Sequence, residues 1–325
     1  MPFERRYIQY KHLVDAYLQR FVKDAQPPSL YQPVRYILSG GGKRVRSVLV
    51  LLACEACGGS KRDALHAGAA MELLHNFTLV HDDIMDHATA RRGRTTIHKK
   101  WDENTAILVG DELLALAYRA LLKTQSPRIH DVSRVFTEGV VEVCEGQAYD
   151  KEFETKPNVR VDDYLLMIQK KTGKLVSVSA ELGALIGKGT KQQVAALRRF
   201  GEHVGRAFQI QDDLLDITAD EKEFGKTIGS DVQGGKRTFL YLEALRNARG
   251  SDKRLLLSFA RNGGVPRKNI KDFQRIYLET GAIDAARTRI AHDLAEAKHE
   301  LRHLRRSPAR DMLHWFTYML LHRTH

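Results

Sequence analysis

The sequence predicts an all-α protein. Nearly every stretch longer than ten residues places apolar side chains three and four residues apart, which is the period of an amphipathic helix. Alternating apolar and polar runs bounded by turn residues, which are typical of strands, are hard to find. The breaks between helical stretches fall at glycine or proline pairs such as Pro27-Pro28 and Gly58-Gly59, because these residues are poor helix formers.

The apolar pattern and these breaks together define the expected helices. We place them at about 5–23, 30–39, 43–57, 61–86, 105–124, 128–152, 162–186, 191–218, 237–248, 251–261, 267–280, 282–305 and 309–323. A chain of 325 residues that is 43% hydrophobic can bury a large core, and no linker, low-complexity segment or repeat marks a domain boundary. We therefore expect a single domain over residues 1–325.

Two aspartate motifs interrupt the apolar pattern with the same spacing, D-D-x-x-D. They are Asp82-Asp83-Ile84-Met85-Asp86 and Asp212-Asp213-Leu214-Leu215-Asp216. On a helix the first and last carboxylates of each motif share a face, so they repel unless a cation or a proton lies between them. A solvated acidic helix face is the alternative, but the apolar neighbours favour a buried site that binds hard cations through oxygen.

Basic residues dominate the formal charge, which is +12. From Arg246 to His325 there are 17 Lys and Arg against 8 Asp and Glu, so most of the excess lies far from the aspartate motifs along the chain. These segments resemble the solvated faces of amphipathic helices and lack the interleaved aromatic residues of a surface that binds single strands. We therefore expect no nucleic-acid partner.

The three cysteines argue against a disulfide framework. Cys54-x-x-Cys57 has a spacing that could bind zinc or support redox chemistry, but no second pair completes four ligands, so buried helix cysteines are the simpler interpretation. No apolar run approaches the ~20 residues that span a bilayer, and the start of the sequence lacks the apolar core of a signal peptide. We expect a cytoplasmic protein without a membrane span.

Two short basic stretches could bind phosphate. Gly40-Gly41-Gly42 precedes Lys43 and Arg46, which we place on one face at the start of a helix, where backbone N–H groups favour anions. Arg91-Arg92-Gly93-Arg94 follows the first aspartate motif and offers guanidinium groups for bidentate phosphate binding. The alternative is that these arginines only neutralise the aspartates. Acids and cations this close together suit a diphosphate bridged by a metal ion.

Two further stretches point to chemistry. Lys170–Lys174 interrupts a long helical pattern, and a kink at Gly173 would free backbone carbonyl groups. After the second aspartate motif, residues 224–238 are rich in glycine and lysine, which suggests a mobile lid that closes over phosphates.

Seven ordered blocks resemble the trans-isoprenyl diphosphate synthase family (polyprenyl synthetases, such as geranylgeranyl and farnesyl diphosphate synthases). The blocks cover about residues 38–238: Gly41-Gly42-Lys43-Arg44-Val45-Arg46; Glu72-Leu73-Leu74-His75; the first aspartate motif with Arg91-Arg92-Gly93; Gly110-Asp111; Glu145-Gly146-Gln147; Lys171-Thr172; and Phe208-Gln209 with the second motif, Lys226 and Lys236. The resemblance implies a bundle of about 11–13 helices around a deep central cavity. It also implies a homodimer that uses magnesium to join isopentenyl diphosphate to an allylic diphosphate.

Carried over by position, the resemblance implies a role for each site residue. About three Mg²⁺ ions would be held on the allylic diphosphate by Asp82, Asp86 and Asp212, supported by Asp83, Asp213 and Asp216. The same diphosphate would bind Arg91, Lys171, Lys226 and Lys236. Isopentenyl diphosphate would bind Lys43, Arg46, His75 and Arg92. The catalytic groups that face the allylic cation would be the carbonyl near Lys171, the Thr172 hydroxyl and the Gln209 amide.

Product length depends on the residues one helical turn before Asp82. Phe77 is bulky and Thr78 is small, a combination that resembles geranylgeranyl (C20) synthases, whereas aromatics at both positions resemble farnesyl (C15) synthases. Phe77 as an ordinary core aromatic is the alternative. For the whole chain, the alternatives are a non-catalytic partner subunit, which two intact aspartate motifs disfavour, and another terpenoid enzyme such as a cyclase, which needs no second diphosphate site.

Overall fold

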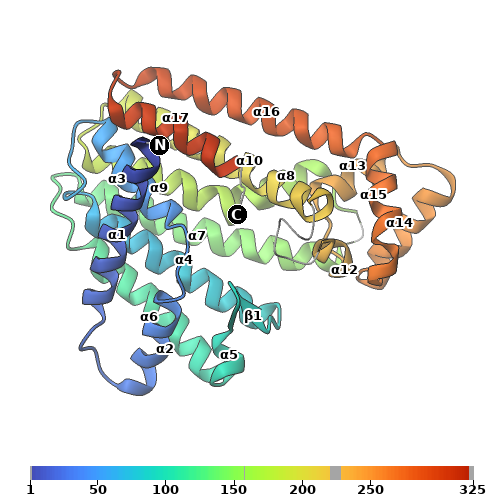
Figure 1. Ribbon diagram of the computed structural model, residues 1–325, viewed down its shortest axis with the longest axis horizontal. Coiled ribbons are helices and arrows are strands. Elements are labelled where there is room, and N and C mark those ends of the chain that lie inside the picture. Colours follow the sequence, from blue (N-terminus) through green and yellow to red (C-terminus); the bar gives the residue numbers. More distant parts are fainter. Residues whose placement is uncertain (1, 157, 220–227, 322–325) are drawn as a thin grey trace. The chain divides into compact units, whose positions relative to one another are not determined.

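The computed structural model describes residues 2–156, 158–219 and 228–321. Its regular structure is nearly all helical (Figure 1), which confirms the all-α prediction. The helices are α1 (Pro2–Phe21), α2 (Pro28–Leu38), α3 (Val45–Ala56), α4 (Leu65–Met85), α5 (Ile97–Lys100), α6 (Glu103–Leu121), α7 (Ile129–Thr155), α8 (Val161–Ile168), α9 (Lys174–Ile186), α10 (Lys191–Thr218), α12 (Ser230–Gln233), α13 (Phe239–Asn247), α14 (Gly250–Asn262), α15 (Ile270–Glu279), α16 (Ala282–Glu300) and α17 (Pro308–Leu321).

Short elements account for the differences from the predicted pattern. The helix expected at 162–186 is divided into α8 and α9 by a π-helical turn, η1 (Gln169–Gly173), so the interruption expected at Lys170–Lys174 is confirmed. Two-residue strands β1 (Ala90–Arg91) and β2 (Arg94–Thr95) form an antiparallel hairpin that the sequence analysis missed. The four-residue helices α5 and α12 were also missed, because one turn is too short to show a period.

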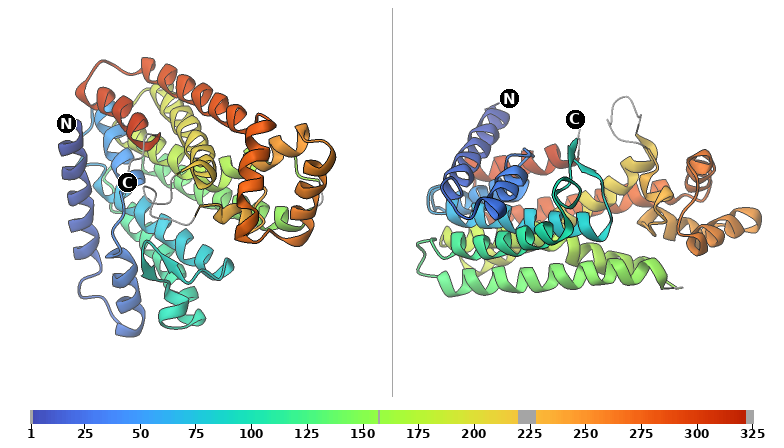
Figure 2. Two further views of the ribbon diagram at one scale, coloured as in Figure 1. Left: turned by 45° about the vertical axis from the view of Figure 1, so that its right-hand side comes forward. Right: turned by 90° about the horizontal axis from the view of Figure 1, so that it is seen from below.

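Contacts divide the chain into two compact units, each built from three stretches. Unit 1 comprises Met1–Val140, Val178–Arg198 and His303–Leu313, and unit 2 comprises Val141–Ser177, Arg199–Arg302 and His314–His325. In unit 1, α4 packs against both α3 and α6 (blue to cyan in Figures 1 and 2). Residues Val48–Cys54 of α3 are all fully buried, so this helix has no solvated face over nearly two turns. Unit 1 therefore carries the first aspartate motif on a helix that its neighbours hold firmly.

Unit 2 has an aromatic core in the segment from α13 to α15. The rings of Tyr241, Phe259, Phe273 and Tyr277 follow one another at centroid distances of 4.9, 5.1 and 5.9 Å, and all four side chains are buried. Helix α16 packs against α13 and α15, as Figure 2 also shows.

Local signals in the sequence explain several helix ends. The side chain of Asp102 accepts hydrogen bonds from the amide and the hydroxyl of Thr105, at 2.8 and 2.7 Å, and so caps the start of α6. Gly263 ends α14 with a left-handed φ of 66°, which glycine adopts without steric cost. Among the described residues, no helix is both long enough and apolar enough to cross a membrane.

Candidate active site

The first aspartate motif lies at the C-terminal end of α4. Asp82 and Asp83 belong to the helix, whereas Asp86 is its C-cap, and the amide of Asp86 donates to the carbonyl oxygen of Asp82 at 2.9 Å. Asp83 is buried, Asp82 is half-buried and Asp86 is exposed. Asp82 and Asp86, which were predicted to share one face of a helix, therefore lie at the end of α4 rather than along a helix that continues.

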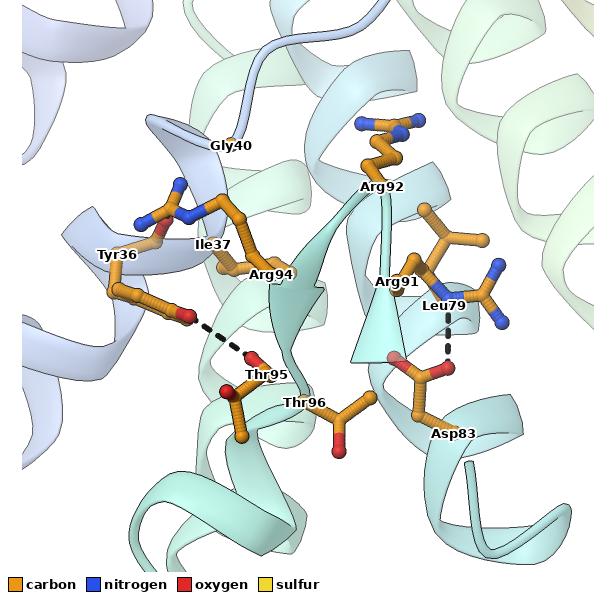
Figure 3. A pocket seen from close by; sticks show the side chains of 10 residues that line it. All are labelled: Tyr36, Ile37, Gly40, Leu79, Asp83, Arg91, Arg92, Arg94, Thr95 and Thr96. Carbon is orange, nitrogen blue, oxygen red and sulfur yellow. Dashed lines mark hydrogen bonds and ion pairs between the residues drawn. The ribbon is translucent and has the colours of Figure 1, made fainter. Parts of the chain in front are cut away.

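Asp83 is bound to an arginine of the hairpin that follows α4. Nε of Arg91 donates to Oδ1 of Asp83 at 2.7 Å (Figure 3). Burial raises the pKa of Asp83, and the positive charge of Arg91 opposes that rise. The carboxylate thus holds an arginine in place, which agrees with a supporting role for Asp83.

The hairpin also meets the glycine-rich turn before α3. Nη1 of Arg92 donates to the carbonyl oxygen of Gly41 at 2.8 Å, and a Cβ on Gly42 would lie only 2.7 Å from the same Nη1. Arg92 and Gly93 have φ values of 52° and 72°, the two left-handed positions of a tight two-residue hairpin turn. The structure therefore brings the two basic stretches together in unit 1.

His75 is half-buried among the arginines of these stretches. Its Nδ1 has no hydrogen-bond partner among the described protein atoms. Burial, and then the charges of Arg46 and Arg92, hold the pKa of His75 well below its ordinary value, so the imidazole is neutral at pH 7. Three of the four residues expected to hold isopentenyl diphosphate thus act on one another electrostatically.

The predicted placement of Lys43 and Arg46 on one helix face is wrong. Helix α3 begins at Val45, and its N-cap, Arg44, has a left-handed φ of 52°, so Lys43 lies outside the helix. The guanidinium of Arg44 explains this start. It is bound by the side chains of Asp15 and Glu72 at 2.7 and 2.8 Å, and by the Leu38 carbonyl oxygen at 2.8 Å.

Phe77 is buried on α4, one turn before the first aspartate motif, and Thr78 is half-buried. The ring of Phe77 packs edge-on against His81 at a centroid distance of 4.8 Å. A Cβ on Gly110 of α6 would lie 2.1 Å from Nε2 of His81, so any larger residue there must displace the His81 ring. This gives Gly110, whose role the sequence analysis left open, a packing function beside Phe77.

In unit 2 the second aspartate motif lies within α10, as predicted. Asp213 is buried and accepts hydrogen bonds from the hydroxyl of Tyr164 and, at 3.0 Å, from Nε2 of Gln209. Oε1 of Gln209 in turn accepts from the hydroxyl of Thr172 at 2.9 Å. The two side chains expected to face the allylic cation, Thr172 and Gln209, are therefore bonded to each other.

Asp216 caps the short helix α12. Its carboxylate accepts from the amide and hydroxyl of Ser230, at 3.2 and 2.6 Å, and from the amide of Asp231 at 3.0 Å. Nζ of Lys236 lies 3.3 Å from Oδ1 of Asp231. Asp231 thus joins the second motif, although the sequence analysis did not assign it; its place between Gly229 and Lys236 was the available signal.

An ion pair holds Lys171, which lies in the π-helical turn η1. Its Nζ lies 2.5 Å from Oδ2 of Asp150 on α7, a partner that the sequence analysis missed. Gly146 allows this approach, because a Cβ there would lie 2.3 Å from the backbone nitrogen of Lys171. π-Helical turns of this kind are frequent at functional sites.

Electrostatics favour cations at the second motif. Burial raises the pKa of both Asp213 and Asp231, and neighbouring carboxylates, Asp212 among them, add to the rise. Carboxylates that resist ionisation are stabilised in their charged form by a hard cation that prefers oxygen ligands. This set of donors therefore fits magnesium. Within residues 2–156, 158–219 and 228–321, no three His, Cys, Asp or Glu side chains are arranged to hold a metal by themselves.

The thiols of the Cys54-x-x-Cys57 pattern are difficult to ionise. Burial raises the thiol pKa of both Cys54 and Cys57 to about 12, which opposes metal binding through thiolates. Cys54 is fully buried in α3, as predicted, and Cys57 is the half-buried C-cap of that helix.

Lys226, expected to hold the allylic diphosphate, lies outside the described residues.

Comparisons with known proteins agree on one family. The model of the polyprenyl synthetase family matches residues 27–277. A short chain isoprenyl diphosphate synthase of Methanothermobacter thermautotrophicus is 36% identical over 318 residues, which cover 98% of this chain and 97% of that protein. The crystal structure of geranylgeranyl pyrophosphate synthetase from Pyrococcus horikoshii Ot3 matches with a TM-score of 0.94 at 36% identity, covering 99% and 100% of the two chains.

A second similar structure contains ligands. It is a polyprenyl synthase from Caulobacter crescentus CB15, complexed with calcium and isoprenyl diphosphate, which matches with a TM-score of 0.89 at 25% identity and covers 99% of this chain and 98% of that one. The family model covers most of this chain, and relatives above 30% identity cover nearly all of it. The chain belongs to the polyprenyl synthetase family.

Proposed function

We propose that this chain joins isopentenyl diphosphate to an allylic diphosphate, head to tail and in the trans configuration, to make a short-chain prenyl diphosphate. As a member of its family the chain is a prenyltransferase. We further propose geranylgeranyl diphosphate (C20) as the product, since the Pyrococcus protein with the similar structure is a geranylgeranyl pyrophosphate synthetase.

One observation carries this proposal: a second set of cationic groups lies beside the first aspartate motif in unit 1. Arg92 contacts the glycine turn that leads to Lys43, and the charges of Arg46 and Arg92 act on the half-buried His75. A cyclase binds a single diphosphate and has no use for a second set. We propose that Lys43, Arg46, His75 and Arg92 hold isopentenyl diphosphate, with neutral His75 donating a ring N–H to the phosphate rather than supplying a positive charge.

Magnesium is the cation that family membership and the carboxylate donors favour. We propose that Asp82, Asp86 and Asp212 are its ligands and that the count is about three ions. When bound, these ions would neutralise charge on the departing pyrophosphate. The supporting aspartates have other tasks in the structure, since Asp83 binds Arg91 and Asp216 caps α12. These contacts agree with supporting roles for Asp83 and Asp216.

Cleavage of the allylic C–O bond leaves negative charge on the pyrophosphate and an allylic cation. We assign Arg91, Lys171, Lys226 and Lys236 to the pyrophosphate, where fixed positive charges stabilise the transition state more than the ground state. The ion pairs that hold Arg91 to Asp83 and Lys171 to Asp150 keep two of these groups in place before substrate binds.

The allylic cation needs dipoles but no nucleophile other than the second substrate. We assign Thr172 and Gln209 to this role, because their mutual hydrogen bond fixes the direction of both side chains. The double bond of isopentenyl diphosphate attacks the cation and forms the new C–C bond. A proton then leaves the adjacent carbon, and the pyrophosphate released in the first step can accept it, so no side-chain base is required.

The domain organisation and the oligomeric state belong to the same proposal. We propose one polyprenyl synthetase domain, because the family match at 27–277 includes residues of both units. We propose a homodimer, because a dimer is typical of the family, and Leu108 of α6 and its C-cap Leu122, 60% and 65% exposed, offer apolar surface for a partner to cover. The molar mass measured by light scattering would test the second point.

A single assay tests the function. Purified protein is incubated with Mg²⁺, labelled isopentenyl diphosphate and, in turn, C5, C10 or C15 allylic diphosphate, and the products are sized by chromatography. We expect elongation that stops at C20. If none of the three primers is elongated, the synthase proposal is wrong, and the non-catalytic subunit becomes the better interpretation. Cyclic hydrocarbons from an allylic diphosphate alone would favour a cyclase.

A pair of variants tests the metal assignment. Asp82→Ala and Asp212→Ala should each abolish turnover while the circular dichroism of the helices stays unchanged. Retained activity in either variant would overturn the assignment of that residue as a ligand.

A further inference from the structure

The hairpin after α4 is held from two sides (Figure 3). On one side, Arg91 of β1 forms its ion pair with Asp83 of α4. On the other side, Arg94 of β2 reaches α2, where the side chain of Tyr36 lies against it. The contact on the α2 side has no place in the catalytic assignments above.

Four interactions make up the contact between β2 and α2. The guanidinium carbon of Arg94 lies 3.9 Å from the centroid of the Tyr36 ring, and Nη1 of Arg94 donates to the Tyr36 carbonyl oxygen at 3.0 Å and to the Ser39 hydroxyl at 3.3 Å. In return, the hydroxyl of Tyr36 donates to the Thr95 carbonyl oxygen at 2.9 Å. Each residue of the pair thus binds both the side chain and the backbone of the opposite element.

This arrangement removes one arginine from the set available to substrate. Arg94 covers an aromatic ring with its guanidinium face and uses Nη1 for two acceptors within the protein. Arg91 and Arg92 differ, because each is anchored beside a proposed substrate site: Arg91 by the first aspartate motif and Arg92 by the glycine turn. The two arginines proposed to bind different diphosphates therefore share one small hairpin.

A two-stranded hairpin of this size is not stable alone in water, so its position depends on what anchors it. Its turn also contains Arg92 in a left-handed conformation, which costs a non-glycine residue free energy unless neighbouring contacts maintain it. The hydrogen bonds of Tyr36 and Arg94 that anchor the hairpin are made by strand β2. Strand β2 lies directly opposite β1, since Arg94 pairs with Arg91 across the ladder.

We propose that Tyr36 and Arg94 are positioning residues that fix the hairpin so that Arg91 and Arg92 reach both diphosphates together. This inference rests on the proposed function. It assigns no contact with substrate to either residue; their effect passes through the two neighbouring arginines.

The test compares Arg94→Met with a matched control, Lys100→Met. Nζ of Lys100 also lies over the Tyr36 ring, at 5.2 Å, and its side chain is exposed, so the control removes a cation from the same ring without releasing the hairpin. We expect Arg94→Met to raise the KM of both diphosphate substrates about tenfold or more, with a smaller effect on kcat, and Lys100→Met to change neither KM. Tyr36→Phe, which loses only the hydroxyl bond to Thr95, should have an intermediate effect.

A double-mutant cycle distinguishes positioning from general destabilisation. If Arg94 acts through Arg92, then adding Arg94→Met to Arg92→Met should raise the KM of isopentenyl diphosphate no further, because the group being positioned is already gone. Additive effects on that KM would overturn the proposal. So would an unchanged KM for either substrate in Arg94→Met, because the hairpin carries both arginines.

A measurement without substrate separates this inference from the proposed function. Amide hydrogen exchange of residues 90–96 should be faster in Arg94→Met than in the wild type and in Lys100→Met, while exchange in α4 stays unchanged. If exchange is unchanged in the hairpin, Tyr36 and Arg94 do not fix it, whatever the enzyme does. If exchange rises but the wild type elongates no primer, the hairpin contact is supported and the proposed function has failed.

Discussion

Nε of Arg91 lies 2.7 Å from Oδ1 of Asp83, and this ion pair joins the hairpin to the first aspartate motif. Because Asp83 is buried and paired with an arginine, it is poorly placed to be a primary metal ligand, whereas Asp82 precedes it at a half-buried position. The middle carboxylate of the motif therefore orients a cationic side chain, which agrees with our proposal that Asp82 and Asp86, rather than Asp83, bind the metal.

Asp83→Asn tests this division, because the substitution preserves size and removes charge. We expect kcat/KM for the allylic substrate to fall about 10- to 100-fold, as for other groups that orient a ligand from behind. Asp82→Asn should abolish measurable turnover. Steady-state kinetics with a labelled substrate would measure both. Equal loss in the two variants would show that Asp83 is itself a ligand.

Arg44 leads to a prediction about stability. Arg44 is 4% exposed, and its guanidinium joins Asp15 of α1, Glu72 of α4 and the end of α2. Arg44→Met therefore leaves buried Glu72 without its cation, whereas Asp15 keeps its ion pair with Lys11. We expect the free energy of unfolding to fall by about 3 kcal/mol, as when a buried ion pair loses one member. Urea unfolding followed by circular dichroism would measure the change.

An exposed arginine in the same unit provides the control. Arg134 forms an i,i+4 pair with Glu138, and both side chains are more than half exposed at 59% and 54%. Arg134→Met should lower the free energy of unfolding by less than about 1 kcal/mol. A similar small loss in Arg44→Met would mean that the buried network contributes little to the fold.

Sequence patterns predicted well wherever the signal was local. Helical periodicity placed α10 at residues 191–218, where the structure has it, and the glycine at 173 predicted the interruption that appears as η1. The helix expected at about 43–57 begins at Val45, and the placement of Lys43 on its face was wrong, because Asp15 and Glu72, residues distant in the chain, hold Arg44 at the N-cap. No pattern around Lys43 contains that information.

The candidate site shows the same limit. Motif spacing led us to propose the aspartates and the basic residues, but it could not identify partners such as Asp150, which lies 21 residues before Lys171 on another helix. Nor could the sequence distinguish among the three arginines of the hairpin. That distinction depends on Tyr36, which reaches the hairpin only in the folded chain.

Asp293 predicts how the stability of unit 2 depends on pH. Burial alone would raise the pKa of this fully buried carboxyl, but hydrogen bonds from Arg206, His203 and Arg289 outweigh burial and hold the pKa well below its ordinary value. The stabilisation is therefore complete above the unfolded-state pKa of about 4 and is lost progressively as the pH falls below it.

Asp293→Asn removes this contribution. We expect the variant to be less stable than the wild type by about 3 kcal/mol at pH 7, near the low end for a broken buried pair because the arginines keep some access to water. The difference between the two proteins should stay constant from pH 7 to 5 and shrink below pH 4. Urea midpoints across this range would show it, and a difference that grows in acid would contradict the ion-pair explanation.

Gly110 gives the last prediction, which concerns product length. His81 fills the space in front of Gly110 and packs against Phe77, so a methyl group at position 110 must displace His81 and with it the support of the Phe77 ring. If Phe77 is the floor of the chain pocket, Gly110→Ala should broaden the products to lengths beyond C20, and Phe77→Ala should lengthen them outright. Chromatography of products from C15 allylic diphosphate would measure both.

A second buried helical glycine separates this effect from overpacking in general. A Cβ on Gly139 of α7 would lie 2.8 Å from Cγ2 of Val178, far in sequence from Phe77, and so Gly139→Ala strains the same unit elsewhere. Both alanine variants should lose about 1–3 kcal/mol of stability, but only Gly110→Ala should change product length. If Gly139→Ala broadens the products equally, loosened packing is the cause. If Phe77→Ala leaves the distribution unchanged, Phe77 is an ordinary core aromatic and the support from His81 has no bearing on product length.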